Sequence, residues 1–164
     1  MKKYSIELKW GILFVVIALL WMYFEKLMGW HDENIAKHAI YTNLFAVIAI
    51  FVYVLALRDK RNNFYGGSMT WSQGFVAGLI VTLIVTILNP LSQYITHRVI
   101  TPEYFTNVIN YAVESGQMTR EAAEKHFNMN SYILQSSLFG LVIGAVTSAI
   151  VALFLRKKGS DTAT

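Results

Sequence analysis

Cysteine is absent from this 164-residue sequence, and proline occurs only twice. The absence of cysteine excludes disulfides, thiolate metal sites and cysteine nucleophiles. Charged residues are scarce, at 15%. Hydrophobic residues reach 55%, above the roughly 45–50% that is usual in soluble domains. This composition predicts one compact membrane domain rather than a soluble protein.

Four long apolar segments account for most of the chain. Since about 20 apolar residues cross a bilayer as a helix, we predict spans over residues 8–28, 39–57, 73–96 and 132–155. The fold class that follows is an all-α membrane protein, a four-transmembrane-helix antiparallel bundle forming a single domain over residues 1–158. Residues 159–164 are predicted to be a disordered cytoplasmic tail. No small-residue cleavage site follows the first span, which favours an uncleaved signal anchor.

Residues 98–130 carry charge and are predicted to form a short helical outer (periplasmic) cap. Thr101-Pro102-Glu103 is typical of a helix start, with the threonine as the capping residue. Thr119 is expected to cap a second short helix.

Lysine and arginine are divided unevenly between the two sides of the predicted bundle. Nine lie on the side of the two termini and the second connection, and five lie on the other side. The positive-inside rule therefore predicts a multi-pass protein of the bacterial inner (cytoplasmic) membrane with both termini cytoplasmic. The net charge of +4 is explained by these positions at helix ends, so no nucleic acid is expected as a partner. The predicted partners are the lipid bilayer and either a second copy of the chain or another membrane protein.

Several strings resemble those of one known family: Glu25-Lys26-x-x-Gly29-x-His31-Asp32, His38-Ala39-Ile40-Tyr41-Thr42-Asn43, Gly67-x-Met69-Thr70-Trp71-x-Gln73-Gly74, Pro90-Leu91-Ser92-Gln93-Tyr94-Ile95-Thr96-His97 and Thr147-Ser148-Ala149-Ile150. Together they resemble a bacterial family of small four-span inner-membrane proteins, domain of unknown function family 4199. The resemblance extends over nearly the whole chain. It implies the four-helix architecture and a bacterial inner membrane, and it implies no activity and no assigned site.

Polar residues gather at the predicted outer ends of the spans: Glu25, His31, Asp32, His38, Asn43 and His97. In an antiparallel bundle these ends come together, so we expect Glu25, His38 and His97 to lie near one another, linked by hydrogen bonds. Imidazole and carboxylate groups suit a divalent metal, zinc or iron. No H-E-x-x-H or E-x-x-H spacing supports a metal site. The alternative is that these residues cap helices and bind lipid headgroups, in which case no cofactor is expected.

A second candidate site lies within the third span, at Asn89, Pro90, Ser92 and Gln93. Proline removes a backbone hydrogen bond, so Asn89-Pro90 is expected to interrupt the helix. Freed carbonyls and amide side chains at such breaks form substrate sites in transporters. No ionisable residue lies in the middle of any predicted span, which argues against a proton relay.

Small residues repeat every four positions along the last two spans: Gly74, Gly78, Thr82 and Thr86, then Ser136, Gly140, Gly144, Ser148 and Ala152. Such ridges allow close helix packing in lipid. Pairing within one chain and pairing between chains are both open, and we favour the third span against the fourth. The four tryptophans lie mostly near span ends and are interpreted as an aromatic belt.

These observations favour an uncharacterised, non-enzymatic membrane bundle that acts as a partner-binding or accessory subunit. One alternative is a metal-dependent membrane enzyme that uses Glu25, His38 and His97. The other is a small-solute transporter or channel subunit with a site at Asn89-Pro90.

Overall fold

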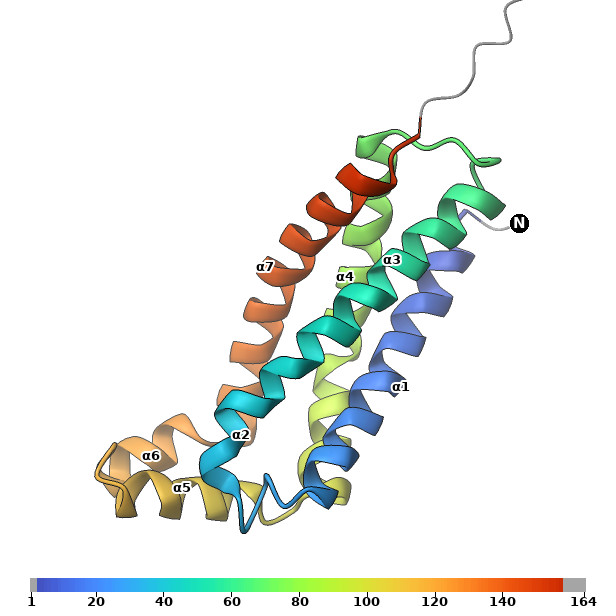
Figure 1. Ribbon diagram of the computed structural model, residues 1–164. Helices are drawn as coiled ribbons and strands as arrows, with labels where there is room; N and C mark the ends of the chain where they lie inside the picture. The colour runs from blue at the N-terminus through green and yellow to red at the C-terminus, as the bar shows by residue number, and fades with distance from the viewer. Residues whose placement is uncertain (1–2, 158–164) are drawn as a thin grey trace, which may run out of the picture. The chain divides into compact units, whose positions relative to one another are not determined.

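The computed structural model describes residues 3–157, and within that range it contains helices and no strand (Figure 1). Four helical segments are long and apolar enough to cross a membrane. The predicted all-α class with four spanning helices is therefore confirmed. The tail predicted over residues 159–164 lies outside the described residues.

The spans are formed by a small set of helices: α1 (Ser5–Leu27); α2 (Ile35–Tyr41), η1 (Thr42–Leu44) and α3 (Phe45–Asn63) in succession; α4 (Trp71–Ile95) continued by η2 (Thr96–Ile100); and α7 (Met129–Leu155). Between the last two spans lie α5 (Tyr104–Glu114) and α6 (Arg120–His126). Thr119 caps α6, since its side chain accepts from the Ala122 amide.

The helix that contains the second predicted span continues past Leu57 to Asn63 and includes Lys60, which is buried. Two local predictions were wrong. Helix α4 is not interrupted at Pro90. Proline removes only one intrahelical bond, and the irregularity comes later, in the π-helical turn η2. Thr101 does not cap α5 with its side chain: Glu103 holds the cap position, without a side-chain bond.

The described residues form two compact units, and each span contributes to both. We call the described parts of Met1–Phe14, Val47–Ile87 and Phe139–Thr164 the terminal unit. We call Val15–Ala46 and Leu88–Leu138 the cap unit, because it includes α5 and α6. Each unit is described by itself.

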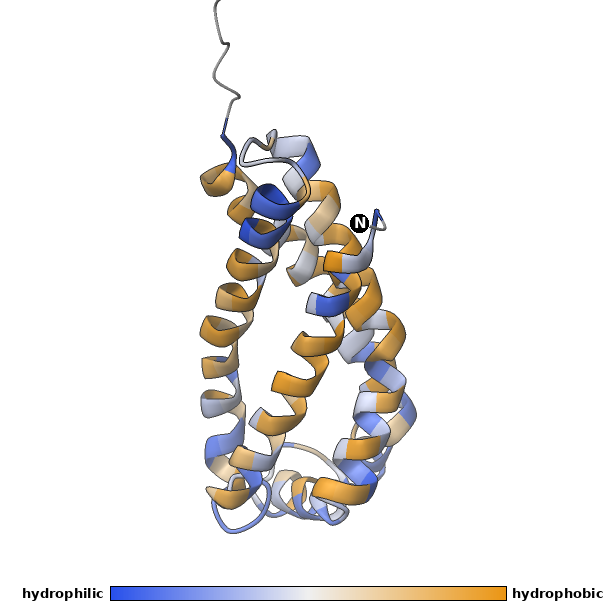
Figure 2. Cartoon of the chain, turned by 90° about the vertical axis from the view of Figure 1, so that its right-hand side faces the viewer, coloured by the Kyte–Doolittle hydropathy of each residue, from blue (hydrophilic) through white to orange (hydrophobic). Residues whose placement is uncertain are grey.

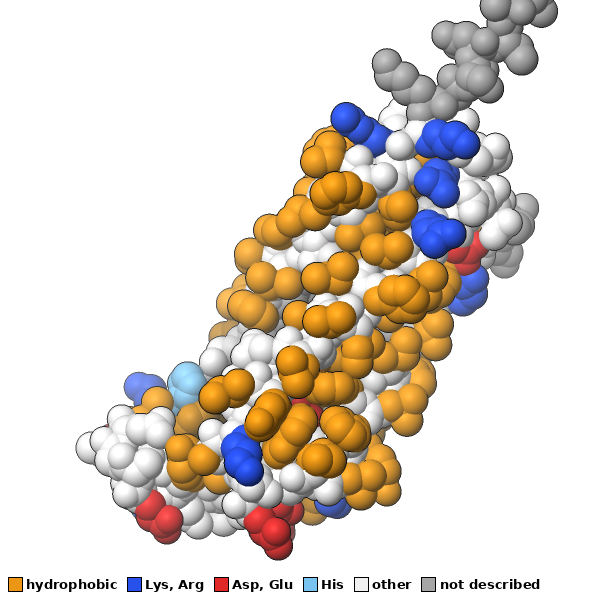
Figure 3. Space-filling view, viewed as in Figure 1, with side chains coloured by type: hydrophobic (Ala, Val, Ile, Leu, Met, Phe, Trp, Pro, Cys, Tyr) orange, Lys and Arg blue, Asp and Glu red, His pale blue; other side chains and the backbone are white. Residues whose placement is uncertain are grey.

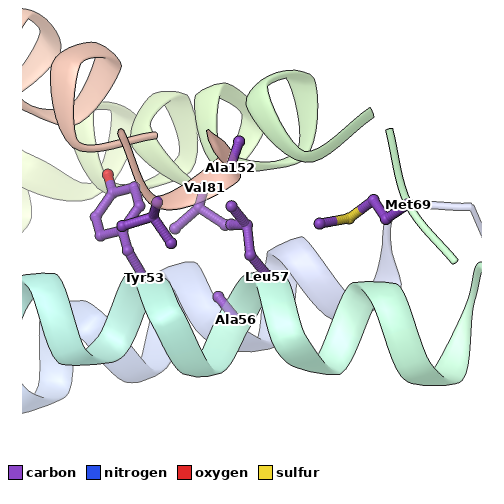
Figure 4. Packing of buried hydrophobic residues seen from close by; sticks show 7 residues of the cluster. Tyr53, Ala56, Leu57, Met69, Val81 and Ala152 are labelled. Atoms are coloured by element: carbon purple, nitrogen blue, oxygen red, sulfur yellow. The ribbon is translucent and has the colours of Figure 1, made fainter. Parts of the chain in front are cut away.

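The core of the terminal unit brings together α3, α4, α7 and Met69 of the connection between α3 and α4 (Figure 4). Small residues allow α4 and α7 to approach closely. A Cβ built on Gly74 would lie 3.0 Å from the Ala152 Cβ, and one built on Gly78 would lie 2.6 Å from the Ser148 Cβ. The predicted pairing of the third span with the fourth is confirmed in this unit. Gly140 is an exception, because a Cβ there would meet nothing within 4 Å.

Large apolar side chains are exposed on all four spans: Leu20 at 63%, Val47 at 70%, Ile87 at 75% and Phe154 at 80%. Figure 2 shows the same pattern as long hydrophobic stretches of helix, and Figure 3 shows apolar side chains along the helices with Lys and Arg gathered at helix ends. Surfaces this apolar are stable in contact with lipid rather than water. The chain is a membrane protein.

Candidate functional site

The carboxylate of Glu25 is the centre of the cap unit's polar site. It lies in the last turns of α1 and is completely buried. Trp21, one helical turn earlier, donates its indole N–H to Glu25 Oε1. This i, i+4 arrangement places both side chains on one face of the helix. Oxygen Oε1 is therefore occupied, and Oε2 faces the histidines.

His31 reaches Glu25 because the chain turns back directly after α1. Gly29 has a φ of 72°, a left-handed conformation that glycine adopts without strain, and the Trp30 amide donates to the carbonyl of Glu25. The His31 Nε2 atom then lies 3.0 Å from Glu25 Oε2, and its side chain is 1% exposed. From α5, Asn107 donates to the His31 carbonyl and holds the turn.

His38, on α2, completes the group. Its Nδ1 atom is 3.3 Å from Glu25 Oε2, but the two are not aligned for a hydrogen bond, so Nδ1 is without a hydrogen-bond partner in the described chain. One ligand atom each from Glu25, His31 and His38 lies within 4.8 Å of the others. These three residues make up what we call the Glu25 centre.

Tyr104, the first residue of α5, packs against three imidazoles. Its ring centroid lies 5.3 Å from those of His31 and His38 and 5.2 Å from that of His97. Its hydroxyl bonds to that of Tyr132 at 2.9 Å. Burial, followed by the neighbouring Tyr132, raises the pKa of Tyr104 well above its usual range. This side chain therefore remains a neutral phenol beside the Glu25 centre.

His97 also packs against Tyr104 but does not join the Glu25 centre. Its Nε2 is 3.1 Å from Gln93 Oε1, and its ring packs on Phe105 at 4.4 Å. The residue is in η2 and is buried. The sequence grouped Glu25, His38 and His97, whereas the structure places His31 with the first two and His97 with Gln93.

Two of the four residues predicted as a midspan site, Asn89 and Gln93, join α4 to α7. The amide nitrogen of Asn89 donates to Ser136 Oγ at 2.8 Å and to Ser137 Oγ at 2.9 Å. Gln93 donates to Ser136 at 3.1 Å. These bonds occupy the amide groups that a substrate would need. Pro90 is exposed on the helix surface, and Ser92 is half-buried.

Asp32 and Asn43 do not reach the Glu25 centre either. Asp32 is exposed and accepts from the Glu33 amide at 2.6 Å. It also lines a surface groove of about 250 Å³ with residues of α5. Asn43 is exposed and donates to the carbonyl of Ala39, one turn before it.

Three polar or aromatic contacts of the structure were not predicted from the sequence. Trp21 was interpreted as part of a lipid-facing belt, although its spacing of four from Glu25 could have indicated the bond. Tyr104 gave no signal, because only the packing of the cap brings it to the histidines. Glu7 and Lys60 were overlooked as a pair: their side chains are 2.8 Å apart and almost completely buried in the terminal unit.

The apolar spans and the buried polar groups between them define an integral helical membrane protein. The family model described as Protein of unknown function (DUF4199) matches residues 9–157, and the chain belongs to this family. The search of curated proteins and the search of solved structures each found no match.

Proposed function

We propose that the protein is a non-enzymatic divalent-metal-binding membrane protein and that the Glu25 centre holds the ion. The observation that carries this proposal is the convergence of one ligand atom each from Glu25, His31 and His38 within 4.8 Å of one another. Two nitrogens and one carboxylate oxygen are a ligand set that zinc accepts, with a water in the fourth position.

The distances support such an ion. Ligand atoms at about 2.0–2.1 Å from a tetrahedral zinc lie roughly 3.3 Å from one another. The Glu25 oxygen is 3.0 Å from His31 Nε2 and 3.3 Å from His38 Nδ1. The histidine ligand atoms lie within 4.8 Å of each other, so binding an ion would draw them together by up to about 1.5 Å. Trp21 would orient the carboxylate through its other oxygen, as outer partners of metal ligands do.

The enclosure of the Glu25 centre favours a role in binding a metal ion over a role in metal-dependent catalysis. Glu25 is 0% exposed and His31 is 1% exposed, the His38 side chain is 17% exposed, and the Tyr104 ring lies against both histidines. A catalytic metal needs a substrate to reach its open position. In an enclosed centre the ion would instead fix the end of α1, the turn after it and α2 to one another.

We further propose that the membrane is the bacterial inner membrane and that both termini are cytoplasmic. The excess of Lys and Arg on the side of the termini supports this orientation. The Glu25 centre would then lie near the outer surface, where metal ions can enter without crossing the bilayer.

The test is metal binding by the full-length protein in detergent. Stripped of metal and incubated with Zn²⁺, the wild type is expected to retain about one ion per chain after gel filtration. Glu25→Gln and His31→Gln should abolish retention. His126→Gln is the matched control, because His126 is exposed on α6. His97→Gln should also retain zinc, since His97 lies outside the centre.

A cobalt spectrum keeps the test decisive if the variants fail to fold. Co²⁺ bound to the wild type should show the intense visible bands of a four-coordinate site. A wild type that retains no zinc and gives only the spectrum of hydrated cobalt would overturn the proposal. Loss of zinc in His97→Gln but not in His31→Gln would overturn the ligand assignment.

A further inference from the structure

A groove of about 320 Å³ lies in the terminal unit, lined by residues of α1, α3, α4 and the connection after α3. Lys3, Tyr65 and Gln73 make part of the groove polar. Val76 and Ile80, one helical turn apart on α4, make the other part apolar. Val76 is 53% exposed on a membrane span, so the groove leads from a charged helix end to the surface that contacts lipid.

We propose that this groove binds one anionic phospholipid with a hydroxylated headgroup, of which phosphatidylglycerol is the simplest. Its phosphate would lie at Lys3 and the first turn of α4, and an acyl chain would follow Val76 and Ile80. This proposal does not depend on the Glu25 centre, which is in the other unit.

The charges of the lining match one phosphate. Three lining residues are ionisable at neutral pH: Lys3, Glu7 and Lys60. Glu7 and Lys60 neutralise each other at 2.8 Å. The Lys60 ammonium also donates to the Lys3 carbonyl and lies 3.7 Å from the Phe64 ring centroid. Among the described lining residues, the uncompensated charge is therefore that of Lys3, and a phosphodiester carries the one negative charge that balances it.

The first turn of α4 supplies further hydrogen-bond donors for the phosphate. The amides of Trp71 and Ser72 begin the helix and have no acceptor within it, which favours an anion there. Gln73 Oε1 accepts from the Thr70 amide at 2.8 Å, so the NH₂ of Gln73 is left to donate.

Glu7 selects the headgroup. Its Oε2 atom is buried and has no hydrogen-bond partner in the described part of the chain. A buried carboxylate oxygen without a donor is destabilising. A glycerol headgroup offers hydroxyl donors beside the phosphate, whereas a choline headgroup has none. Phosphatidylglycerol therefore satisfies both the Lys3 ammonium and the free Glu7 oxygen.

The experiment measures lipid binding to the full-length protein in detergent by native mass spectrometry, with a metal chelator present throughout. Dioleoylphosphatidylglycerol is expected to bind about tenfold more tightly than dioleoylphosphatidylcholine, because of one charge and one hydrogen bond. Lys3→Gln should weaken phosphatidylglycerol binding about fivefold and phosphatidylcholine binding less, because the choline cation already offsets the charge of its own phosphate. Arg58→Gln is the matched control, because Arg58 is exposed near the same end of α3 and does not line the groove.

Four results would overturn the proposal. Equal affinity for phosphatidylglycerol and phosphatidylcholine would show that the lipid charge does not determine binding. Equal losses of phosphatidylglycerol affinity in Lys3→Gln and Arg58→Gln would show that any basic residue at this surface has the same effect. Tighter binding of phosphatidylethanolamine than of phosphatidylglycerol would refute the headgroup assignment. Binding of glycerol 1-phosphate as tight as that of the lipid would show that Val76 and Ile80 hold no acyl chain. Because the chelator is present, none of these results bears on zinc binding.

Discussion

Lys60 and Glu7 form an ion pair of 2.8 Å in which the lysine is 3% exposed and the glutamate 2%. Lys60→Met should lower the free energy of unfolding by about 3–5 kcal/mol, because it leaves a buried carboxylate without its cation. Adding Glu7→Gln should restore most of that loss. Chemical unfolding in detergent measures both effects.

Lys9→Met is the control for Lys60→Met. Lys9 pairs with Asp59, but its side chain is 57% exposed, and exposed ion pairs contribute about 0–1 kcal/mol. If Lys60→Met is no more destabilising than Lys9→Met, the buried pair does not stabilise the terminal unit.

Gly78→Leu should separate α4 from α7. Even a Cβ at this position would lie 2.6 Å from the Ser148 Cβ and 3.2 Å from its Cα. Overpacking of this kind destabilises by about 1–3 kcal/mol, and a lower melting temperature in detergent would show it. Gly140→Leu makes the same change where nothing lies within 4 Å and should melt like the wild type. Similar melting of the two variants would contradict the close approach.

Asn89→Ala should weaken the contact between α4 and α7 in the cap unit. It removes the bonds to Ser136 and Ser137, and such interhelical bonds contribute about 0.6–1.7 kcal/mol in membrane proteins. Asn43→Ala removes only a bond within its own helical segment and serves as the control. Thermal unfolding of the pair should rank Asn89→Ala as the less stable, and the opposite order would refute the assignment.

The raised pKa of Tyr104 predicts that the folded protein loses stability at alkaline pH. Its pKa is raised in the folded protein above the ordinary value of 10.0, so above pH 10 the unfolded chain loses this proton while the folded chain keeps it. The stabilisation is complete below pH 10 and declines as pH rises beyond it. The difference in unfolding free energy between wild type and Tyr104→Phe should therefore shrink from about pH 8 to about pH 11. A constant difference would show that Tyr104 ionises as readily when folded.

Topology can be tested directly, because the sequence has no cysteine. A cysteine in place of exposed Asn63 should be shielded from an impermeant maleimide in intact spheroplasts, and one in place of exposed Gln117 should be labelled. The reverse pattern would invert the proposed orientation.

The spans and the contact between α4 and α7 follow from sequence patterns that act along one helix: apolar length and a small residue every four positions. The approach of His38 to Glu25 also follows from two adjacent antiparallel segments. His31 could not be placed in the same way, because its position depends on the backbone turn at Gly29. Tyr104 depends on how the cap packs, and the bonds of Asn89 depend on which face of α7 meets α4. Such tertiary choices leave no periodic signal in the sequence.

Glu25, His31 and His38 lie within 14 consecutive residues, whereas Tyr104, which packs against both histidines, comes much later in the chain. Short separations close with little loss of chain entropy and favour fast formation of contacts. During synthesis the carboxylate and both imidazoles can therefore meet as soon as the first two helical segments are made. Their aromatic cover follows only after α4 and the start of α5 have been added. The metal ion proposed for the Glu25 centre would then enter during this interval, before the cap folds over the three side chains.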